Sequence, residues 1–132
     1  SLDGEEVVVR TAASDGRQVG GVNVRFDLPT DDATNVLEVR VQVVARLARS
    51  GGDSVLRLSI YNPVDERFDT VVEQLVADGT ARQLAFRTDS LRHVTRERQF
   101  RLAVIGDVVA GDPTDLAIDL VAVDLVLRTI PN

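Results

Sequence analysis

The chain has 132 residues, of which 44% are apolar and 27% are charged, and its formal net charge is −6. A chain of this length and composition folds as one globular domain, so we expect a single soluble domain over residues 1–132. The negative charge argues against nucleic-acid and anionic-membrane partners, and no apolar run approaches the roughly 18 residues of a membrane helix. Cysteine is absent, which excludes disulfides and thiolate metal sites.

The segment Glu6–Thr11 reads as a first strand, made apolar by Val7, Val8 and Val9. We favour the interpretation that it belongs to its own sandwich, because consecutive strands usually lie side by side. The alternative is that residues 1–12 form a docking or donor strand, which completes the sheet edge of an adjacent subunit through main-chain hydrogen bonds.

Alternation of apolar and polar residues predicts the next three strands. Their inward-facing positions are Val22, Val24, Phe26 and Leu28; then Leu37, Val39, Val41, Val43, Ala45 and Leu47; then, after a turn at Gly51-Gly52-Asp53, Leu56, Leu58 and Ile60. Tyr61-Asn62-Pro63 ends the third of these strands, because proline has no donor for a ladder.

The segment Phe68–Val76 predicts a further strand, and Asp78-Gly79 is the best candidate for a two-residue hairpin turn. A short strand through Leu84 and Phe86 follows. From Asp89 to Glu97 the alternation stops, and we expect a single helical turn there.

Strand alternation resumes at Phe100, Leu102 and Val104, and Gly106–Asp115 reads as a polar loop. Residues 116–128 predict a long final strand whose apolar phase shifts midway, which indicates a β-bulge near Leu120. About eight strands joined by short turns, without a long helix, predict an all-β, antiparallel β-sandwich of the jelly-roll type.

Catalytic patterns are weak in this sequence. His93 is the only histidine, and Ser90 and Asp89 lie near it, but there is no Gly-x-Ser-x-Gly elbow. Neighbours in sequence rarely form a triad in space, so we interpret His93 as a surface residue. We expect a protein that is not an enzyme and has no resident cofactor.

Acidic residues in the loop Gly106–Asp115 offer one metal hypothesis. Asp107, Asp112 and Asp115 could supply carboxylate oxygens to Ca²⁺, with loop carbonyls completing the shell. The alternative is ordinary turn chemistry of Asp and Gly.

Sugar-binding sandwiches use exposed aromatic faces, and aromatic residues make up only 4% of this chain. Phe26, Phe86 and Phe100 fall on inward phases, which leaves Tyr61 and Phe68 as candidates for stacking on a ligand. Because both flank a turn, we favour packing in the core over ligand stacking.

Charged and polar residues alternate with core residues on several strands. We interpret them as a solvated sheet face, with a polar interface between subunits as the alternative. These outer positions are Arg25, Asp27, Glu38, Arg40, Arg57, Gln99 and Arg101.

Three patterns resemble the jelly-roll accessory sandwiches of secreted microbial proteins, of the galactose-binding-like and carbohydrate-binding-module type. They are Leu56-x-Leu-x-Ile-Tyr-Asn followed by Arg67-Phe68-Asp69, then Ile118-Asp119-Leu120-Val121, and the earlier Val24-Arg25-Phe26-Asp27-Leu28-Pro29. The resemblance implies a non-catalytic extracellular module, often adhesive or structural.

The leading hypothesis is therefore a structural or adhesive protein of the cell exterior. It would self-assemble into a homo-oligomer or filament, or pack with other surface proteins, through sheet faces and edges. The alternative is an accessory module that binds a glycan or another ligand, with Ca²⁺ as a stabilising ion.

Overall fold

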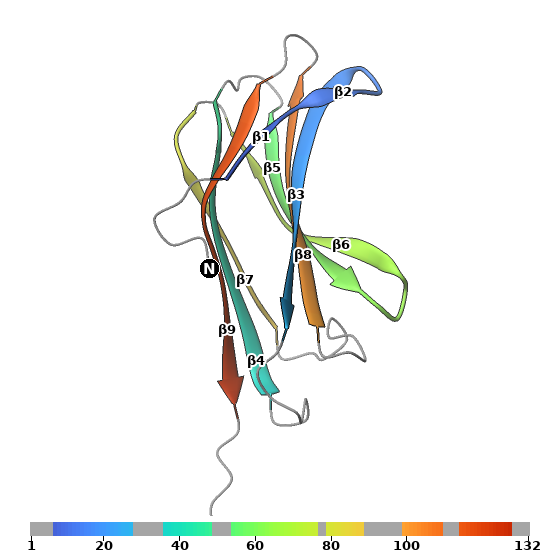
Figure 1. Cartoon of the computed structure of the whole chain (residues 1–132), viewed down its shortest axis with the longest axis vertical. Helices are drawn as coiled ribbons and strands as arrows, with labels where there is room; N and C mark the ends of the chain where they lie inside the picture. Colours follow the sequence, from blue (N-terminus) through green and yellow to red (C-terminus); the bar gives the residue numbers. More distant parts are fainter. Residues whose placement is uncertain are drawn as a thin grey trace, which may run out of the picture.

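The computed structural model describes residues 7–27, 36–48, 54–76, 79–88, 99–109 and 114–127, which contain nine β-strands and no helix (Figure 1). The strands are β1 (Val7–Arg10), β2 (Ala12–Ser14), β3 (Arg17–Asp27), β4 (Val36–Leu47), β5 (Val55–Asn62), β6 (Arg67–Leu75), β7 (Arg82–Thr88), β8 (Gln99–Val109) and β9 (Asp115–Leu127). A helix able to cross a membrane does not occur within these ranges.

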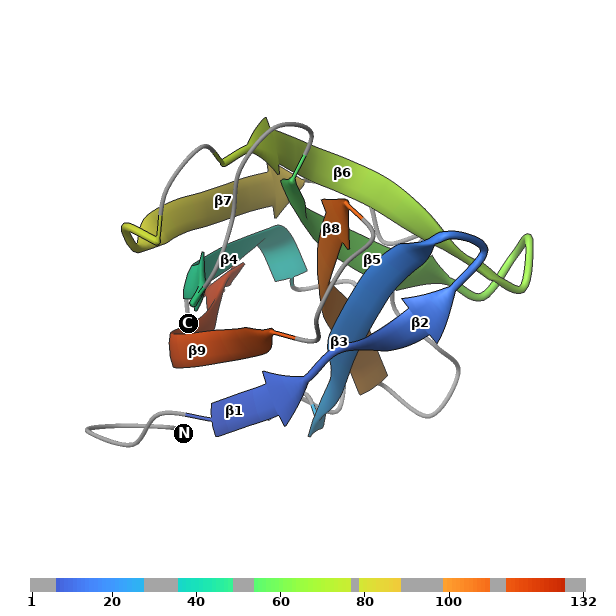
Figure 2. The ribbon, with the colours of Figure 1, turned by 90° about the horizontal axis from the view of Figure 1, so that it is seen from above.

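Two antiparallel sheets form the sandwich. One has four strands in the order β1-β9-β4-β7, and the other has five in the order β2-β3-β8-β5-β6. The two sheets face each other when the molecule is seen from above (Figure 2). The all-β antiparallel sandwich predicted from the sequence is confirmed.

The core lies between the sheets and consists of the inward residues of the alternating strands. Val39, Val41 and Val43 of β4 face Leu56, Leu58 and Ile60 of β5 across it, each at most 1% exposed. Phe100, Leu102 and Val104 of β8 are also fully buried, as predicted. Burial of such side chains stabilises each by about 1.5–3 kcal/mol, which makes this core the main source of stability.

A β-bulge in β9 confirms the phase shift seen in the sequence. Val44 pairs with Leu120 and Ala45 with Ile118, so that Asp119 has no partner on β4. The extra residue lets β9 keep apolar residues toward the core on both sides of the bulge.

The chain changes sheets at Thr11, between β1 and β2. The Thr11 amide donates to the Thr114 carbonyl at 2.8 Å, and the Thr114 amide donates to Thr11 Oγ1 at 2.9 Å. Thr11 Oγ1 also donates to Gln18 Oε1 at 3.2 Å. These bonds satisfy the buried polar groups where the ladder is interrupted.

The N-terminal strand β1 pairs with β9 of its own chain, with Val7 opposite Ile118 and Val9 opposite Leu116. This is the arrangement favoured from the sequence. It makes β1 an edge of the four-stranded sheet and leaves Val8 53% exposed.

The prediction of a hairpin at Asp78-Gly79 is wrong. The flanking strands β6 and β7 are edges of different sheets, so the chain crosses the sandwich there instead of reversing within one sheet. The Asp-Gly hairpin lies at Asp15-Gly16, between β2 and β3, where both residues have positive φ, 48° and 78°. That is the backbone a two-residue type I′ turn requires.

The predicted loop Gly106–Asp115 begins too early, because β8 continues to Val109. Gly106 is a strand residue at a close approach: a Cβ there would lie 2.6 Å from Leu47 Cδ2 and 3.4 Å from Leu116 Cδ1. Its glycine reflects packing across the core rather than a turn. The predicted turn at Gly51-Gly52-Asp53 and the predicted helical turn from Asp89 to Glu97 lie outside the described residues.

Candidate functional site

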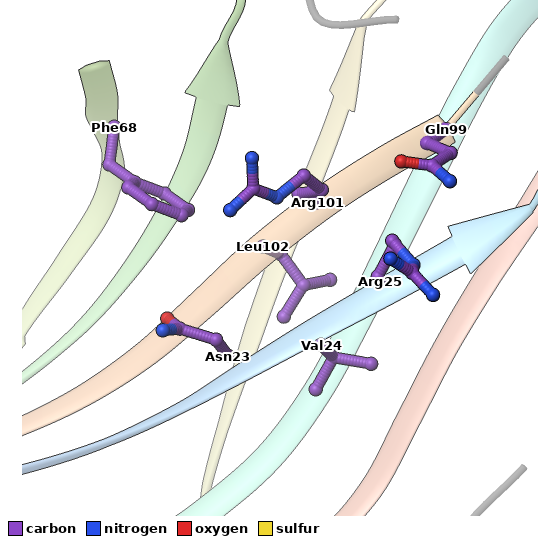
Figure 3. A pocket seen from close by; sticks show the side chains of 7 residues that line it. All are labelled: Asn23, Val24, Arg25, Phe68, Gln99, Arg101 and Leu102. Carbon is purple, nitrogen blue, oxygen red and sulfur yellow. The ribbon is translucent and has the colours of Figure 1, made fainter. Parts of the chain in front are cut away.

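A hollow of about 510 Å³ opens on the outer face of the five-stranded sheet. Its polar lining comes from β3 and β8, and Phe68 of β6 closes one side (Figure 3). Ligand pockets in proteins commonly span about 300–1,000 Å³. The residues around it are Asn23, Val24, Arg25, Phe68, Gln99, Arg101 and Leu102.

Strand alternation explains which side chains reach this face. Phe26 and Leu102 point to the core, so Asn23, Arg25 and Arg101 point away from it. Asn23 and Arg25 are exposed, while Gln99 and Arg101 are half-buried. The outward placement of Arg25, Gln99 and Arg101 follows from the sequence pattern; the hollow between them does not.

The hairpin β5–β6 carries an aromatic pair beside the hollow. Tyr61 and Phe68 are directly opposite in the register, with ring centroids 5.3 Å apart and planes at 66°, an edge-to-face arrangement. Phe68 is 37% exposed, and neither ring belongs to the core. The interpretation of both as core residues is therefore wrong, and the structure brings the two stacking candidates together on the surface.

Arg101 covers this aromatic pair. Its guanidinium carbon lies 4.5 Å from the centroid of the Tyr61 ring and 5.9 Å from that of Phe68. Attraction between the cation and the ring faces fixes the side chain across β5 and β6. Because the guanidinium lies close over Tyr61, Phe68 is the ring more accessible to a ligand.

Asn62 holds the turn that connects the two aromatic residues. Its side-chain oxygen accepts hydrogen bonds from the amides of Val64 and Asp65, at 3.0 and 3.2 Å. Its side-chain nitrogen donates to Asp65 Oδ2 and Asp69 Oδ2, at 3.2 and 3.1 Å. Asn62 is 1% exposed, so this Asx-type turn is a buried anchor for the hairpin.

Both hairpins of the five-stranded sheet, β2–β3 and β5–β6, extend away from the four-stranded sheet (Figures 1 and 2). The β5–β6 hairpin borders the hollow through Phe68, which lines it, and Tyr61 is the cross-strand partner of Phe68. This arrangement places the aromatic pair at the border of the outer face rather than in its centre.

Asp107 lies on the same outer face, further along β8. Arg17 Nε donates to Asp107 Oδ1, and Arg57 Nη1 donates to Asp107 Oδ2 at 2.9 Å. Arg57 Nε also donates to Glu73 Oε2 at 2.8 Å. Both carboxylate oxygens of Asp107, a predicted Ca²⁺ ligand, therefore accept hydrogen bonds from guanidinium groups.

These ion pairs shift the pKa values of Asp107 and Arg57. Burial alone would raise the pKa of Asp107, but the hydrogen bonds and charges of Arg17 and Arg57 outweigh burial and lower the pKa below its ordinary value. The hydrogen bonds to Glu73 and then Asp107 raise the pKa of Arg57.

The other members of the predicted calcium set are placed elsewhere. Asp115 begins β9 in the four-stranded sheet and faces Arg10 at 3.7 Å, while Asp112 lies outside the described residues, as does His93. No cluster of three or more His, Asp or Glu side chains able to hold a metal occurs in the part of the chain that the structure describes.

A second hollow, of about 430 Å³, lies on the outer face of the four-stranded sheet, between β4 and β7. Arg40 and Arg87 are directly opposite there, and Glu38 bridges them at 3.0 and 3.7 Å. Phe86 is half-buried and packs against the core, as expected from its phase. The described residues that line this hollow have their two arginines bridged by Glu38, and they include no pair of exposed aromatic rings.

A comparison with solved structures finds a protein of similar fold. The chain matches a structure described as "CBM4 structure and function" with a TM-score of 0.51 and 14% identity, covering 89% of this chain and 94% of that one. The chain therefore shares its β-sandwich fold with that protein, which is a carbohydrate-binding module. The resemblance seen in the sequence patterns is thus confirmed at the level of the fold. No protein-family model and no curated protein sequence matches the chain.

Proposed function

We propose that the domain is a non-catalytic module that binds a glycan on the outer face of its five-stranded sheet. The observation that carries the proposal is the combination, in one hollow of about 510 Å³, of an exposed aromatic ring with amide and guanidinium groups. The fold shared with a carbohydrate-binding module supports the same assignment.

The chemistry of the hollow suits a sugar. The exposed ring of Phe68 offers an apolar face for the C–H side of a pyranose, while the amides of Asn23 and Gln99 can donate to and accept from hydroxyls. Aromatic surface with a few orienting polar groups is the usual composition of small-ligand sites.

Binding fits this hollow better than hydrolysis does. Glycoside hydrolases use a pair of carboxylates beside the scissile bond, and none of the described residues that line the hollow is Asp or Glu. We therefore assign recognition, without bond cleavage, to this face, and we place such a module outside the cell, attached to or acting beside other surface proteins.

Assembly through sheet edges is the second candidate, favoured by one observation. β1 is a four-residue edge strand with an exposed Val8, and such an edge can accept another strand. Self-assembly predicts that the full chain forms oligomers. A truncated chain without residues 1–12 should no longer assemble, while it stays soluble. A chain that stays monomeric at high concentration by light scattering would exclude it.

The test of glycan binding is a glycan array probed with the labelled full chain and with two variants of the same hairpin. Phe68→Ala should weaken binding by about tenfold, because it removes the accessible ring. Val64→Ala is the matched control: Val64 is 74% exposed at the turn and lies outside the hollow. The proposal would be contradicted if both variants lost glycan binding equally, or if the parent protein bound no glycan on a broad array.

A further inference from the structure

Two arginines occupy directly opposite positions in the hollow. Arg25 of β3 pairs with Arg101 of β8, and both side chains point out from the same face (Figure 3). Directly opposite residues on one face of an antiparallel pair have Cβ atoms about 4.5–5.5 Å apart, and like charges at this position are destabilising. The fold places this like-charged pair at its candidate ligand site, with the Arg101 guanidinium turned toward Tyr61 and Phe68.

The repulsion is not relieved by an acidic side chain in the described part of the chain. Asp27 is the nearest acid in the register, and it lies opposite Gln99 rather than opposite either arginine. Six other described arginines each have a carboxylate within 4.0 Å: Arg10, Arg17, Arg40, Arg57, Arg67 and Arg87. Arg25 and Arg101 therefore differ from these six arginines, although the chain has 21 acidic residues.

The four-stranded sheet provides an internal comparison. Arg40 and Arg87 are likewise directly opposite on neighbouring antiparallel strands, but Glu38 lies 3.0 Å from Arg40 and 3.7 Å from Arg87. The same cross-strand geometry thus has a bridging carboxylate on one face of the sandwich and, among the described residues, none on the other. The positive pair is the one that lines the hollow beside the exposed Phe68.

Arg101 is also held in place before any ligand arrives. Its contacts with the rings of Tyr61 and Phe68, at 4.5 and 5.9 Å, restrict the guanidinium to one side of the hollow. A preorganised guanidinium loses less entropy when it binds, and its planar fork matches a carboxylate or a sulfate with two hydrogen bonds.

We infer that the hollow selects glycans that carry an acidic group, a carboxylate or a sulfate, and that Arg25 and Arg101 bind that group together while Phe68 contacts the sugar ring. This inference rests on the proposed glycan binding and adds the ligand's charge to it. The formal charge of −6 would repel a polyanion as a whole, so attraction must come from this local pair.

The test compares matched ligands by isothermal titration and affinity electrophoresis of the full chain. Polygalacturonate is compared with its methyl-esterified form, and cellulose sulfate with hydroxyethyl cellulose, so that each pair differs chiefly in its anionic group. We expect at least one acidic polymer to bind about tenfold more tightly than its neutral partner. Which pair shows the difference identifies carboxylate or sulfate.

Variants distinguish the arginine pair from general charge effects. The double variant R25Q/R101Q should remove the preference for the acidic polymer, whereas R40Q/R87Q, with the same change in net charge and geometry, should keep it. Equal binding of acidic and neutral polymers by the parent chain would overturn this inference and leave glycan binding intact. Absence of binding to all four polymers and to a glycan array would overturn both. If both double variants lost the preference for the acidic polymer equally, the role of the Arg25–Arg101 pair would also be overturned.

Discussion

Arg25 and Arg101 lie directly opposite each other on β3 and β8, and no described carboxylate pairs with either of them. On the other sheet Arg40 and Arg87 have the same relationship with Glu38 between them. The arginine pair on the five-stranded sheet therefore lacks, among the described residues, the bridging carboxylate that the pair on the four-stranded sheet has. This contrast is the basis of the first prediction.

Replacing Arg25 by Gln should raise stability. The change removes like-charge repulsion against Arg101 without breaking a salt bridge, so we expect a gain of about 0.5 kcal/mol in the free energy of unfolding. Urea denaturation at low ionic strength measures it, and the gain should shrink in high salt as the charges are screened. Arg40→Gln is the control and should give no gain, because it breaks the contact with Glu38. A loss of stability in R25Q would show that Arg25 has a stabilising partner.

Replacing Gly106 by Ala should destabilise the sandwich by about 1–3 kcal/mol, the usual cost of overpacking a core. The new methyl group would lie 2.6 Å from Leu47 Cδ2, and Leu47 is itself only 1% exposed, so it has little room to move. Thermal unfolding measures the loss. Gly21→Ala is the matched control in the same sheet, since its Cβ would meet only ordinary contacts, 3.4 Å from the Val104 carbonyl oxygen and 3.5 Å from Ile105. Similar melting temperatures for the two variants would contradict the close packing at Gly106.

Replacing Asp107 by Asn should cost about 2 kcal/mol at neutral pH, because Arg17 and Arg57 lose their shared carboxylate. Asp107 has a lower pKa in the folded protein than in the unfolded chain. Its ion pairs therefore stabilise the fold above the unfolded pKa, about 3.9 for an aspartate, and that contribution is lost as the pH falls through the folded value.

The pH dependence of unfolding checks this account of Asp107. The difference in stability between the parent chain and D107N should be full at pH 7 and should narrow below about pH 4. A difference that stays constant down to pH 2 would mean that the carboxylate charge does not contribute.

Replacing Asn62 by Ala should loosen the hairpin that carries Tyr61 and Phe68. The variant loses both acceptor bonds to the turn amides and both donor bonds to Asp65 and Asp69, so we expect a loss of about 1–3 kcal/mol. Denaturation measures the stability, and nuclear Overhauser effects between the two rings measure their contact. Unchanged ring contacts in N62A would show that the register alone holds the aromatic pair.

The sequence predicted the architecture because side-chain alternation has only two phases. Val39 to Leu47 and Leu56 to Ile60 lie in the core as expected, and the bulge at Asp119 follows from the change of phase in the last strand. The same rule placed Arg25 and Arg101 on an outer face. These features depend on residues close together in the chain.

Pairing between distant strands could not be predicted in this way. Asp15-Gly16 and Asp78-Gly79 contain the same dipeptide, but only the first joins neighbouring strands of one sheet. The contacts of Asp107 with Arg17 and Arg57 span 90 and 50 residues, so its sequence neighbours indicated a loop rather than an ionic centre. The opposition of Arg25 and Arg101 depends on the register of β3 and β8 in the same way.

The position of the aromatic pair could be predicted only in part from the sequence. Tyr61 and Phe68 flank a turn, and the sequence correctly suggested that they meet across the hairpin. The side of the sheet that Phe68 occupies depended on the bulge in β6, where Val72 pairs with Leu58 and Thr70 with Ser59, leaving Val71 as the extra residue. An extra residue reverses the phase of a strand, and the adjacent apolar residues Val71 and Val72 left that phase ambiguous in the sequence.

The central claim is tested most directly by mapping the residues that a bound glycan contacts. Amide and arginine side-chain resonances of the ¹⁵N-labelled protein, followed during titration with the polymer that binds best, report this position. The account predicts shifts concentrated at Arg25, Phe68, Gln99 and Arg101, with Arg40 and Arg87 unchanged. Shifts concentrated on the four-stranded sheet, or along the edge strand β1, would contradict it.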